Sequence, residues 1–263
     1  MPTGNMLEGR VAIVTGGGGE IGGAICRRFG REGASVLVTD VIAERAETVA
    51  NEIREAGGTA HPFKLDVGKP EECEAAGNEA VGKFGRLTTL VNAAATVTPD
   101  GTVETLTLEQ WENTLRINLT SMFLMCKYAI PHMRKTGGGA IVNIASTHGQ
   151  LGIGLRSPYC TSKAGVIQFT KVLAIDFGPE NIRANTISPG PIDTQRILRR
   201  YGTREAANKV RGPGQLLGRT GLPDEIAKGA AFLASDEASF MTGTDLLLDG
   251  GHLAFKGEIQ PKN

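Results

Sequence analysis

Short apolar runs of the kind that form buried strands alternate with helical patterns along almost the whole chain. The first run, Val11–Thr15, leads directly into a cluster of glycines and then into a helical stretch over residues 21–32. Continuous apolar runs are typical of parallel strands covered on both faces, and helices between them favour right-handed crossovers. The pattern therefore predicts a doubly wound α/β fold with a mainly parallel sheet flanked by helices.

The remaining elements continue the alternation. Further strands are expected at 35–40, 63–66, 87–94, 140–146, 182–188 and 245–249, which makes seven in all. Helices are expected at 42–56, 71–84, 107–135, 158–177 and 223–234. No break in composition and no polar linker divides the chain, so residues 1–263 are expected to form one domain.

Charge and cysteine usage exclude several classes of function. The chain has 28 basic residues (Lys and Arg) and 28 acidic residues (Asp and Glu), so its formal net charge is zero. Nucleic-acid binders and polybasic membrane-surface proteins need a surplus of basic residues. Residues 1–10 lack the apolar core of a signal peptide, and no apolar run is long enough for a spanning helix. The four cysteines include no C-x-x-C pair. We therefore expect a cytoplasmic protein without a metal site, a nucleic-acid partner or a membrane partner.

The glycine cluster predicts a nucleotide site. Six glycines fall among the nine residues 15–23, where they let the backbone approach a pyrophosphate at the N-terminal end of a helix. Asp40 ends the second strand, where a carboxylate can accept hydrogen bonds from adenosine ribose hydroxyls and repel a 2′-phosphate. The pattern predicts a dinucleotide site that prefers NAD to NADP, although Arg45 is close in sequence. In the alternative interpretation, Asp40 only caps the helix that follows.

Taken in order, the motifs over about residues 7–251 resemble those of the short-chain dehydrogenases/reductases, a family with a Rossmann-like fold. The glycine cluster resembles the family's TGxxxGxG loop, and residues 92–95 resemble its NNAG segment. Asn118, Ser146, Tyr159 and Lys163 match the catalytic tetrad, the last two with the YxxxK spacing. The cofactor-binding residues that the resemblance implies are Gly16, Gly18, Gly19, Glu20, Ile21, Gly22, Asp40, Asp66, Val67, Asn92, Tyr159, Lys163, Pro189, Ile192 and Thr194.

The chemistry of the tetrad suits hydride transfer. Tyr159 and Lys163 are four residues apart on an expected helix, so they share one face. A nearby ammonium stabilises a phenolate, which makes a tyrosine usable as a general acid/base near neutral pH. The resemblance implies that Tyr159 moves the proton, that Lys163 also contacts the nicotinamide ribose and that Asn118 holds a water behind it. Ser146 is expected to bind the substrate oxygen.

Two departures from the family's motifs matter, one in the glycine loop and one at the end of the NNAG segment. Glu20 stands where the family has the middle glycine of its loop, and Ala95 stands where the NNAG segment ends in glycine. We expect Glu20 to point to solvent and to complement the helix dipole, while Gly18 and Gly19 allow the close approach to the cofactor. Replacement of Glu20 by glycine is expected to change the affinity for NAD without abolishing activity.

Substrate contacts are expected from Ser146, His148, Gln150 and Tyr159. His148 and Gln150 can bond to a polar substrate group, but His148 can equally cap the strand end or be solvated. Residues 194–216 lie where the family has a mobile substrate lid. Against the single acid Glu205, the stretch 196–211 carries Arg196, Arg199, Arg200, Arg204, Lys209 and Arg211. These charges either steer an anionic substrate or form one solvated helix face.

The leading interpretation is an oxidoreductase that transfers a hydride between NAD(H) and a small-molecule secondary alcohol or ketone. One alternative is an NADPH-dependent 3-oxoacyl carrier-protein reductase, which the basic lid favours and Asp40 opposes. Another is a non-catalytic, nucleotide-sensing scaffold, which the intact Ser146, Tyr159 and Lys163 oppose. The long apolar helices at 107–135 and 158–177 resemble helices that pair between subunits in the family, so a homotetramer is expected, with a dimer as the alternative.

Overall fold

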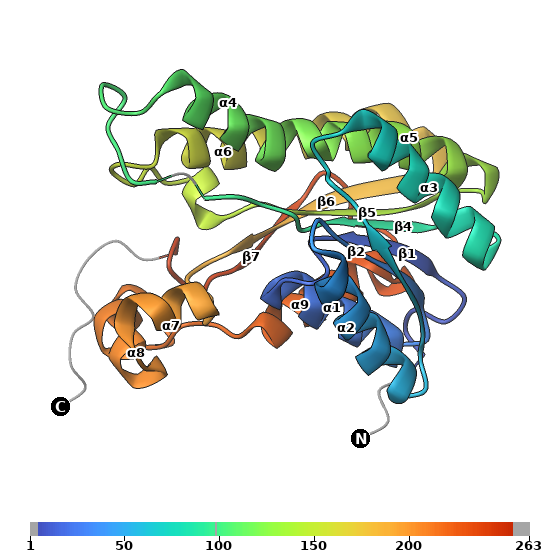
Figure 1. Cartoon of the computed structure of the whole chain (residues 1–263), viewed down its shortest axis with the longest axis horizontal. Coiled ribbons are helices and arrows are strands. Elements are labelled where there is room, and N and C mark those ends of the chain that lie inside the picture. The colour runs from blue at the N-terminus through green and yellow to red at the C-terminus, as the bar shows by residue number, and fades with distance from the viewer. Residues whose placement is uncertain (1–4, 98, 255–263) are drawn as a thin grey trace.

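The computed structural model describes residues 5–97 and 99–254. Its centre is a seven-stranded sheet with the order β3-β2-β1-β4-β5-β6-β7, in which every neighbouring pair is parallel (Figure 1). The strands are β1 (Val11–Thr15), β2 (Ser35–Asp40), β3 (Thr59–Lys64), β4 (Thr89–Asn92), β5 (Gly139–Ile144), β6 (Ile182–Pro189) and β7 (Asp245–Leu248). The expected Rossmann-like α/β fold is confirmed.

Helices cover both faces of the sheet. They are α1 (Glu20–Arg31), α2 (Ala43–Glu55), α3 (Pro70–Phe84), α4 (Leu108–Leu115), α5 (Ser121–Lys135), α6 (Ser157–Phe177), α7 (Gln195–Tyr201), α8 (Arg204–Arg211) and α9 (Pro223–Ala234). In Figure 1, α1, α2 and α9 lie below the sheet and α3 to α6 lie above it. Val14 packs in the lower core and its neighbour Ile13 in the upper one, as expected for a strand buried on both faces.

Two expected elements differ from the structure. The third strand was expected over 63–66, but β3 is Thr59–Lys64 and includes Pro62. It is the edge strand of the sheet, where a residue without an N–H is tolerated. The single helix expected over 107–135 consists of α4, a π-helical turn Arg116–Thr120 and α5. The π turn contains the buried Asn118, and such turns are frequent at functional sites.

Residues 194–216, expected as a lid, form α7, α8 and a short 3₁₀ turn at Gly212–Gly214. In Figure 1, α7 and α8 lie below one end of the sheet, apart from the helices that cover its faces. All four cysteines are free thiols, and Cys26, Cys73 and Cys126 are buried. Among the described residues, no helix has the length and apolar character needed to cross a membrane.

Candidate active site

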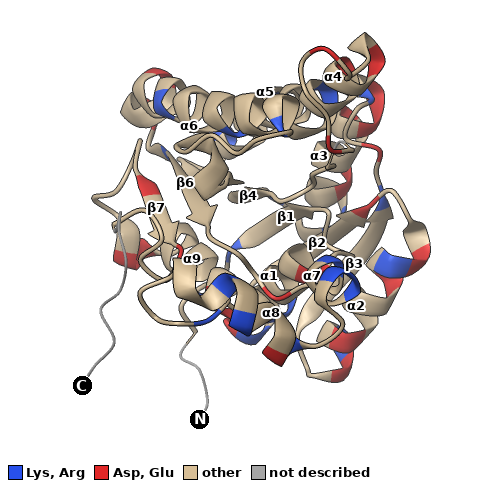
Figure 2. Cartoon of the chain, turned by 90° about the vertical axis from the view of Figure 1, so that its left-hand side faces the viewer, with Lys and Arg blue, Asp and Glu red and all other residues tan. Residues whose placement is uncertain are grey.

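The carboxyl ends of the central strands gather the segments that carry the expected site residues. Thr15 pairs in register with Asn92, which in turn pairs with Asn143 near the end of β5. Figure 2 looks onto this edge of the sheet, with α6 above it and α1 and α7 below. In an open parallel sheet, ligands bind outside these strand ends. The residues at this edge are therefore the candidate site.

Within the glycine loop the backbone turns tightly, so that Gly22 lies close to Gly16 and Gly16 lies close to the segment after β4. Gly16 has a φ of +64°, and a Cβ there would lie 2.8 Å from the Cα of Ala94. The Thr15 hydroxyl accepts hydrogen bonds from the N–H groups of Ala93 and Ala94, at 3.0 and 3.1 Å. A Cβ on Gly22 would lie 2.1 Å from the Gly16 carbonyl oxygen. Larger residues at these two positions would push the turn apart.

The first turn of α1 fits the pyrophosphate of a dinucleotide. Its N-cap residue is Gly19, which has no side chain to cap the helix. Within residues 5–97 and 99–254, the backbone N–H groups of Glu20, Ile21 and Gly22 have no hydrogen-bond acceptor. Unpaired N–H groups at the positive end of a helix dipole bind anions. The chain therefore presents donors at the place where the sequence predicts the cofactor.

Asp40 lies beside this loop with its carboxylate already ordered. Its Oδ2 accepts a hydrogen bond from the Gly18 N–H at 3.2 Å, and its Oδ1 accepts one from the Ile42 N–H at 3.0 Å. The second bond lies in the turn before α2, whose N-cap residue is Ile42 without a side-chain capping bond, so the interpretation of Asp40 as the helix cap is wrong. The Asp40 carboxylate has further lone pairs for ribose hydroxyls. Arg45 packs against the same place, because a Cβ on Gly18 would lie 2.4 Å from the Arg45 Cβ.

Two side chains expected in the catalytic and substrate sites lie against the Tyr159 ring, and Ser146 bonds to the backbone of one of them. The Lys163 ammonium lies 5.8 Å from the centre of this ring. The His148 ring meets it edge to face, with a centroid distance of 6.2 Å and an interplanar angle of 75°. Ser146, at the end of the β5 segment, accepts a hydrogen bond from the His148 N–H at 3.2 Å. The fold thus brings Ser146, His148, Tyr159 and Lys163 together.

Lys163 is almost fully buried, and its ammonium donates a hydrogen bond to the Ile144 carbonyl oxygen at 2.8 Å. Burial disfavours the charged form and lowers the pKa of Lys163 to about 8. An ammonium has three protons to donate. The described residues supply an acceptor for one of them, so two remain for a ligand or for water.

Asn118 connects the segment after β4 to the turn that carries Tyr159. Its Oδ1 accepts a hydrogen bond from the Thr96 N–H at 2.8 Å, and its Nδ2 donates to the Thr96 carbonyl and to Ser162 Oγ. Ser162 Oγ in turn donates to the Tyr159 carbonyl at 2.7 Å. The amide of Asn118 is therefore engaged by the protein itself, and a water behind Lys163 would need other partners.

Two further residues of the expected site have side chains bonded elsewhere. Asn92 donates from its Nδ2 to the Asn143 Oδ1 at 2.8 Å, inside the core. Gln150 donates from its Nε2 to Asp245 on β7. Sequence patterns could not reveal these partners, because each is far away in the chain.

The remaining expected cofactor residues flank the edge of the sheet. Asp66 accepts a hydrogen bond from the Gly68 N–H at 2.9 Å, and Val67 is buried. Pro189 ends β6, Ile192 is buried and forms a bridge with Gly221, and Thr194 is the N-cap of α7. These segments lie where the sequence predicts the adenine and nicotinamide ends.

Basic groups from three segments face His148, and sequence reasoning missed two of them. Burial lowers the pKa of His148, and the positive charges of Arg211, His252, Arg156 and Arg196 act in the same direction. Arg196 and Arg211 belong to the expected basic lid, whereas Arg156 and His252 carried no signal in the sequence. Arg156 is also paired with Asp100.

Comparisons with known proteins agree with this geometry. A protein-family model described as enoyl-(acyl carrier protein) reductase matches residues 18–252. The chain is 40% identical over 247 residues to a D-threitol dehydrogenase of Mycolicibacterium smegmatis, covering 94% of each chain. It is also 40% identical over 247 residues to a 2,5-dichloro-2,5-cyclohexadiene-1,4-diol dehydrogenase of Sphingobium indicum, covering 94% of this chain and 97% of the relative.

A solved structure gives the same picture. The crystal structure of a short-chain type dehydrogenase/reductase from Mycobacterium marinum superimposes with a TM-score of 0.87 at 32% identity. The match covers 94% of this chain and 97% of that one. The chain therefore belongs to the short-chain dehydrogenases/reductases and is an oxidoreductase that acts on CH–OH groups with a nicotinamide cofactor.

Proposed function

We propose that the protein interconverts a secondary alcohol and a ketone with NAD(H), and that Tyr159 is the general acid/base. The observation that carries this proposal is the grouping of Tyr159, Lys163, His148 and Ser146 at the carboxyl edge of the sheet. The edge also carries the unpaired N–H groups of α1. A site with a dinucleotide cradle and a Tyr–Lys pair suits removal of a proton beside a nicotinamide.

Each residue has a separate task in this reaction. When bound, the nicotinamide cofactor supplies the hydride exchange, and the protein handles the proton. The Lys163 ammonium stabilises the Tyr159 phenolate by its charge, and the phenolate Oη then takes the hydroxyl proton of the alcohol and becomes the neutral phenol. Ser146 Oγ donates a hydrogen bond to the substrate oxygen as its charge changes. Asn118 acts through its bonds to Thr96 and Ser162, which hold the turn carrying Tyr159 in place.

The choice of NAD rests on Asp40. Its carboxylate lies against Gly18, where the adenosine ribose is expected, and its negative charge opposes a 2′-phosphate. Arg45 packs on the same glycine and favours the second candidate, an NADP-dependent reductase. A carboxylate fixed by two backbone N–H groups outweighs an arginine on a flexible, exposed side chain, so NAD remains the proposal.

The substrate we propose is a small polyol or cyclic alcohol. The two dehydrogenases reported above are named for a linear polyol and a cyclic diol. Leu151, Ile153 and Leu155 follow His148 in the chain and are exposed, so they can line an apolar wall beside it. A ring or chain with more than one hydroxyl would place one of them at Tyr159 and another near His148.

The direct test is a panel of linear polyols, cyclic alcohols and diols, each assayed with NAD and with NADP for formation of the reduced nicotinamide. We expect turnover of a secondary alcohol with NAD as the better cofactor. Turnover with NADP alone would favour the second candidate. Binding of NAD without turnover of any alcohol of the panel would contradict the proposal.

We also propose that the protein is a homotetramer, with 194–216 as a mobile lid. Phe123 on α5 and Val172 and Ile175 on α6 are exposed on the outer helical layer, and Phe240 and Leu247 are exposed at the β7 edge. Two separate apolar surfaces on one chain suit two kinds of subunit contact. Sedimentation of the purified protein tests this, and a monomer at micromolar concentration would contradict it.

A further inference from the structure

A hydrogen bond joins the cofactor loop to the lid across 175 residues of sequence. The Gln195 N–H, at the first residue of α7, donates to the Glu20 carboxylate at 2.7 Å. Glu20 is the first residue of α1 and stands where the resembled family has a glycine. Figure 2 shows the two helices next to each other below the sheet edge. Among the described residues, no other hydrogen bond or ion pair joins α7 to the glycine loop.

The helix α7 needs this partner. It has seven residues, too few to be stable without tertiary support. Its N-cap residue, Thr194, makes no side-chain capping bond. The neighbouring α8 differs, because the hydroxyl of its own N-cap residue Thr203 accepts a hydrogen bond from the Ala206 N–H at 3.1 Å. A negative side chain at a helix N-terminus pairs with an otherwise unpaired N–H and complements the dipole.

The rear of the lid is held differently from its front. Asn208 on α8 accepts two hydrogen bonds from Thr220, and the Leu217 N–H donates to the Gly250 carbonyl oxygen. At the front, Asp193 pairs with Arg204 and the Asp193 N–H donates to the Gly221 carbonyl oxygen, while α7 itself has its buried Ile197 and the bond to Glu20. Removal of the Glu20 carboxylate should therefore loosen α7 selectively.

We propose that Glu20 is a positioning residue that caps the lid helix α7 from the cofactor loop. It thereby fixes Thr194 and the first turn of the lid over the nicotinamide end of the site. The part of this inference that concerns substrate rests on the proposed function, whereas the contact itself does not. A glycine at position 20 has no side chain for this bond, so the departure from the family pattern gives this chain a lid contact that the loop pattern itself lacks.

The first experiment measures amide hydrogen exchange of the ligand-free protein, which needs no activity. In Glu20→Ala, the amides of α7 should exchange about fivefold faster, the effect of a typical lost N-cap. In Glu20→Gln an acceptor oxygen remains, and the effect should be clearly smaller because only the charge is lost. Thr203→Ala is the matched control: it should loosen α8 and leave the first turn of α7 unchanged.

The second experiment measures steady-state kinetics of the same variants with the best alcohol. Glu20→Ala should raise the substrate KM severalfold with a smaller change in kcat, because Tyr159 is not moved, and Glu20→Gln should recover most of the loss. Equal exchange of α7 in the wild type and in Glu20→Ala would overturn the proposal, even if the enzyme is active. If no alcohol is turned over but exchange of α7 rises as expected, the capping role stands and the proposed function fails.

Discussion

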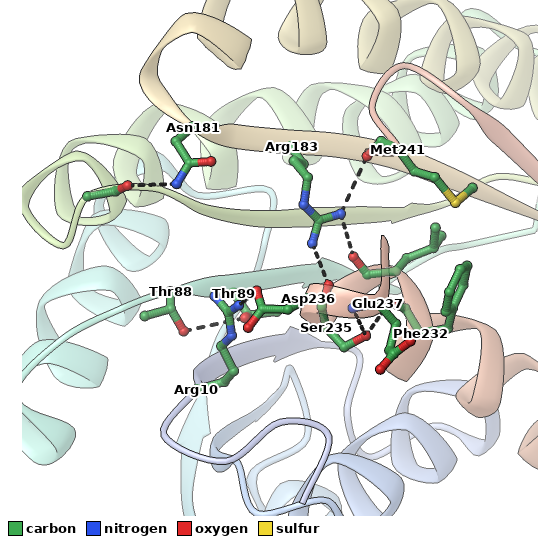
Figure 3. A network of polar contacts seen from close by, with 12 residues as sticks. Arg10, Thr88, Thr89, Asn181, Arg183, Phe232, Ser235, Asp236, Glu237 and Met241 are labelled. Carbon is green, nitrogen blue, oxygen red and sulfur yellow. Dashed lines mark hydrogen bonds and ion pairs between the residues drawn. The ribbon is translucent and has the colours of Figure 1, made fainter. Parts of the chain in front are cut away.

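At the amino ends of the strands, the guanidinium of Arg183 donates hydrogen bonds to the carbonyl oxygens of Leu233, Ser235 and Met241, at 2.9, 2.9 and 3.4 Å (Figure 3). At the carboxyl ends, the buried ammonium of Lys163 donates to one carbonyl oxygen. Burial lowers the pKa of both side chains. Arg183 at the amino end uses its protons to connect loops of the protein, whereas Lys163 at the carboxyl end has protons that remain available to a ligand.

Buried polar side-chain atoms that lack a hydrogen-bond partner lie mostly toward the carboxyl ends of the strands. Among the described residues, four buried side-chain atoms lack a hydrogen-bond partner. Asn92 Oδ1 belongs to the end of β4, Asp193 Oδ1 to the segment after β6 and Gln215 Oε1 to the lid, while Arg28 Nε lies toward the opposite end. Two open surface pockets lie toward the amino end, one lined by Arg28, Glu32 and Asp236 and the other by Arg10, Arg183 and Asp236. The unused bonding capacity of buried side chains therefore points mainly to the carboxyl end, away from these pockets.

The largest expected difference between the two ends comes from a pair of serines. Ser146→Ala should lower kcat by about 10²–10³-fold, because a donor to the substrate oxygen is lost, and change the melting temperature little. Ser235→Ala should do the reverse. Its hydroxyl accepts from the Glu237 N–H and donates to the Phe232 carbonyl oxygen (Figure 3), so its loss lowers stability. Steady-state kinetics and thermal unfolding are measured for both variants. If kcat per folded molecule falls as far in Ser235→Ala as in Ser146→Ala, the proposed difference between the two ends is wrong.

The second prediction concerns stability against pH. Lys163 has a folded pKa of about 8, below the roughly 10.4 of an unfolded lysine, so the unfolded state binds more protons between these values. The stability of the ligand-free wild type should therefore gain, on the order of 3 kcal/mol, as the pH rises through this window. Lys163→Met should lack this gain. Urea unfolding at several pH values measures it, and parallel curves for the two proteins would show that the buried ammonium costs nothing.

Replacement of Arg183 should have a smaller effect on stability. Arg183→Met removes one donor from each of three carbonyl oxygens and should destabilise the fold by about 1–3 kcal/mol. The Met241 oxygen keeps the donor Asn185 Nδ2, and the Ser235 oxygen keeps the Ala238 N–H. The kcat of the folded fraction should stay the same, because the Arg183 side chain bonds only at the amino end. Urea unfolding and active-site-normalised kinetics test both parts. A fall in kcat without loss of stability would contradict the claim that the amino end serves stability and the carboxyl end serves catalysis.

The smallest predicted effect is on the choice of cofactor. Asp40→Ala removes a negative charge beside Gly18 and leaves Arg45 in place, so the ratio of kcat/KM for NADP to that for NAD should rise about tenfold. Asp66→Ala is the control for loss of a carboxylate elsewhere in the expected cofactor site: it should affect NAD and NADP alike and leave the ratio unchanged. An unchanged ratio in Asp40→Ala would limit the role of Asp40 to its bonds with the Gly18 and Ile42 N–H groups.

The sequence was most informative where chemistry depends on residues close together in the chain. The strand–glycine–helix order and the four-residue spacing of Tyr159 and Lys163 are local patterns, and the structure brings these residues to one edge. The π turn at Asn118 was not foreseen, because a single helical period runs through α4 and α5. Its position depends on Thr96 and Ser162, which no local pattern connects.

The contact of Glu20 with Gln195 shows the same limit. We expected Glu20 to point to solvent, and its side chain is exposed, yet its carboxylate bonds to a helix that follows the sixth strand. For residues 196–211 a single solvated helix face was one interpretation, but the division into α7 and α8 was not foreseen, because seven or eight residues give too little periodicity to recognise. Long-range contacts of this kind follow from the order of the strands in the sheet, and this order cannot be read from the spacing of residues in the sequence.

The most direct test of the proposed chemistry replaces Tyr159 by phenylalanine, which keeps the ring and removes the hydroxyl. Turnover of the best alcohol and the Kd for NADH are measured side by side on the wild type and Tyr159→Phe. We predict that kcat falls by about 10²–10⁴-fold while the Kd for NADH stays close to that of the wild type. Near-normal turnover by the phenylalanine variant, with NADH still bound, would contradict the assignment of Tyr159 as the general acid/base.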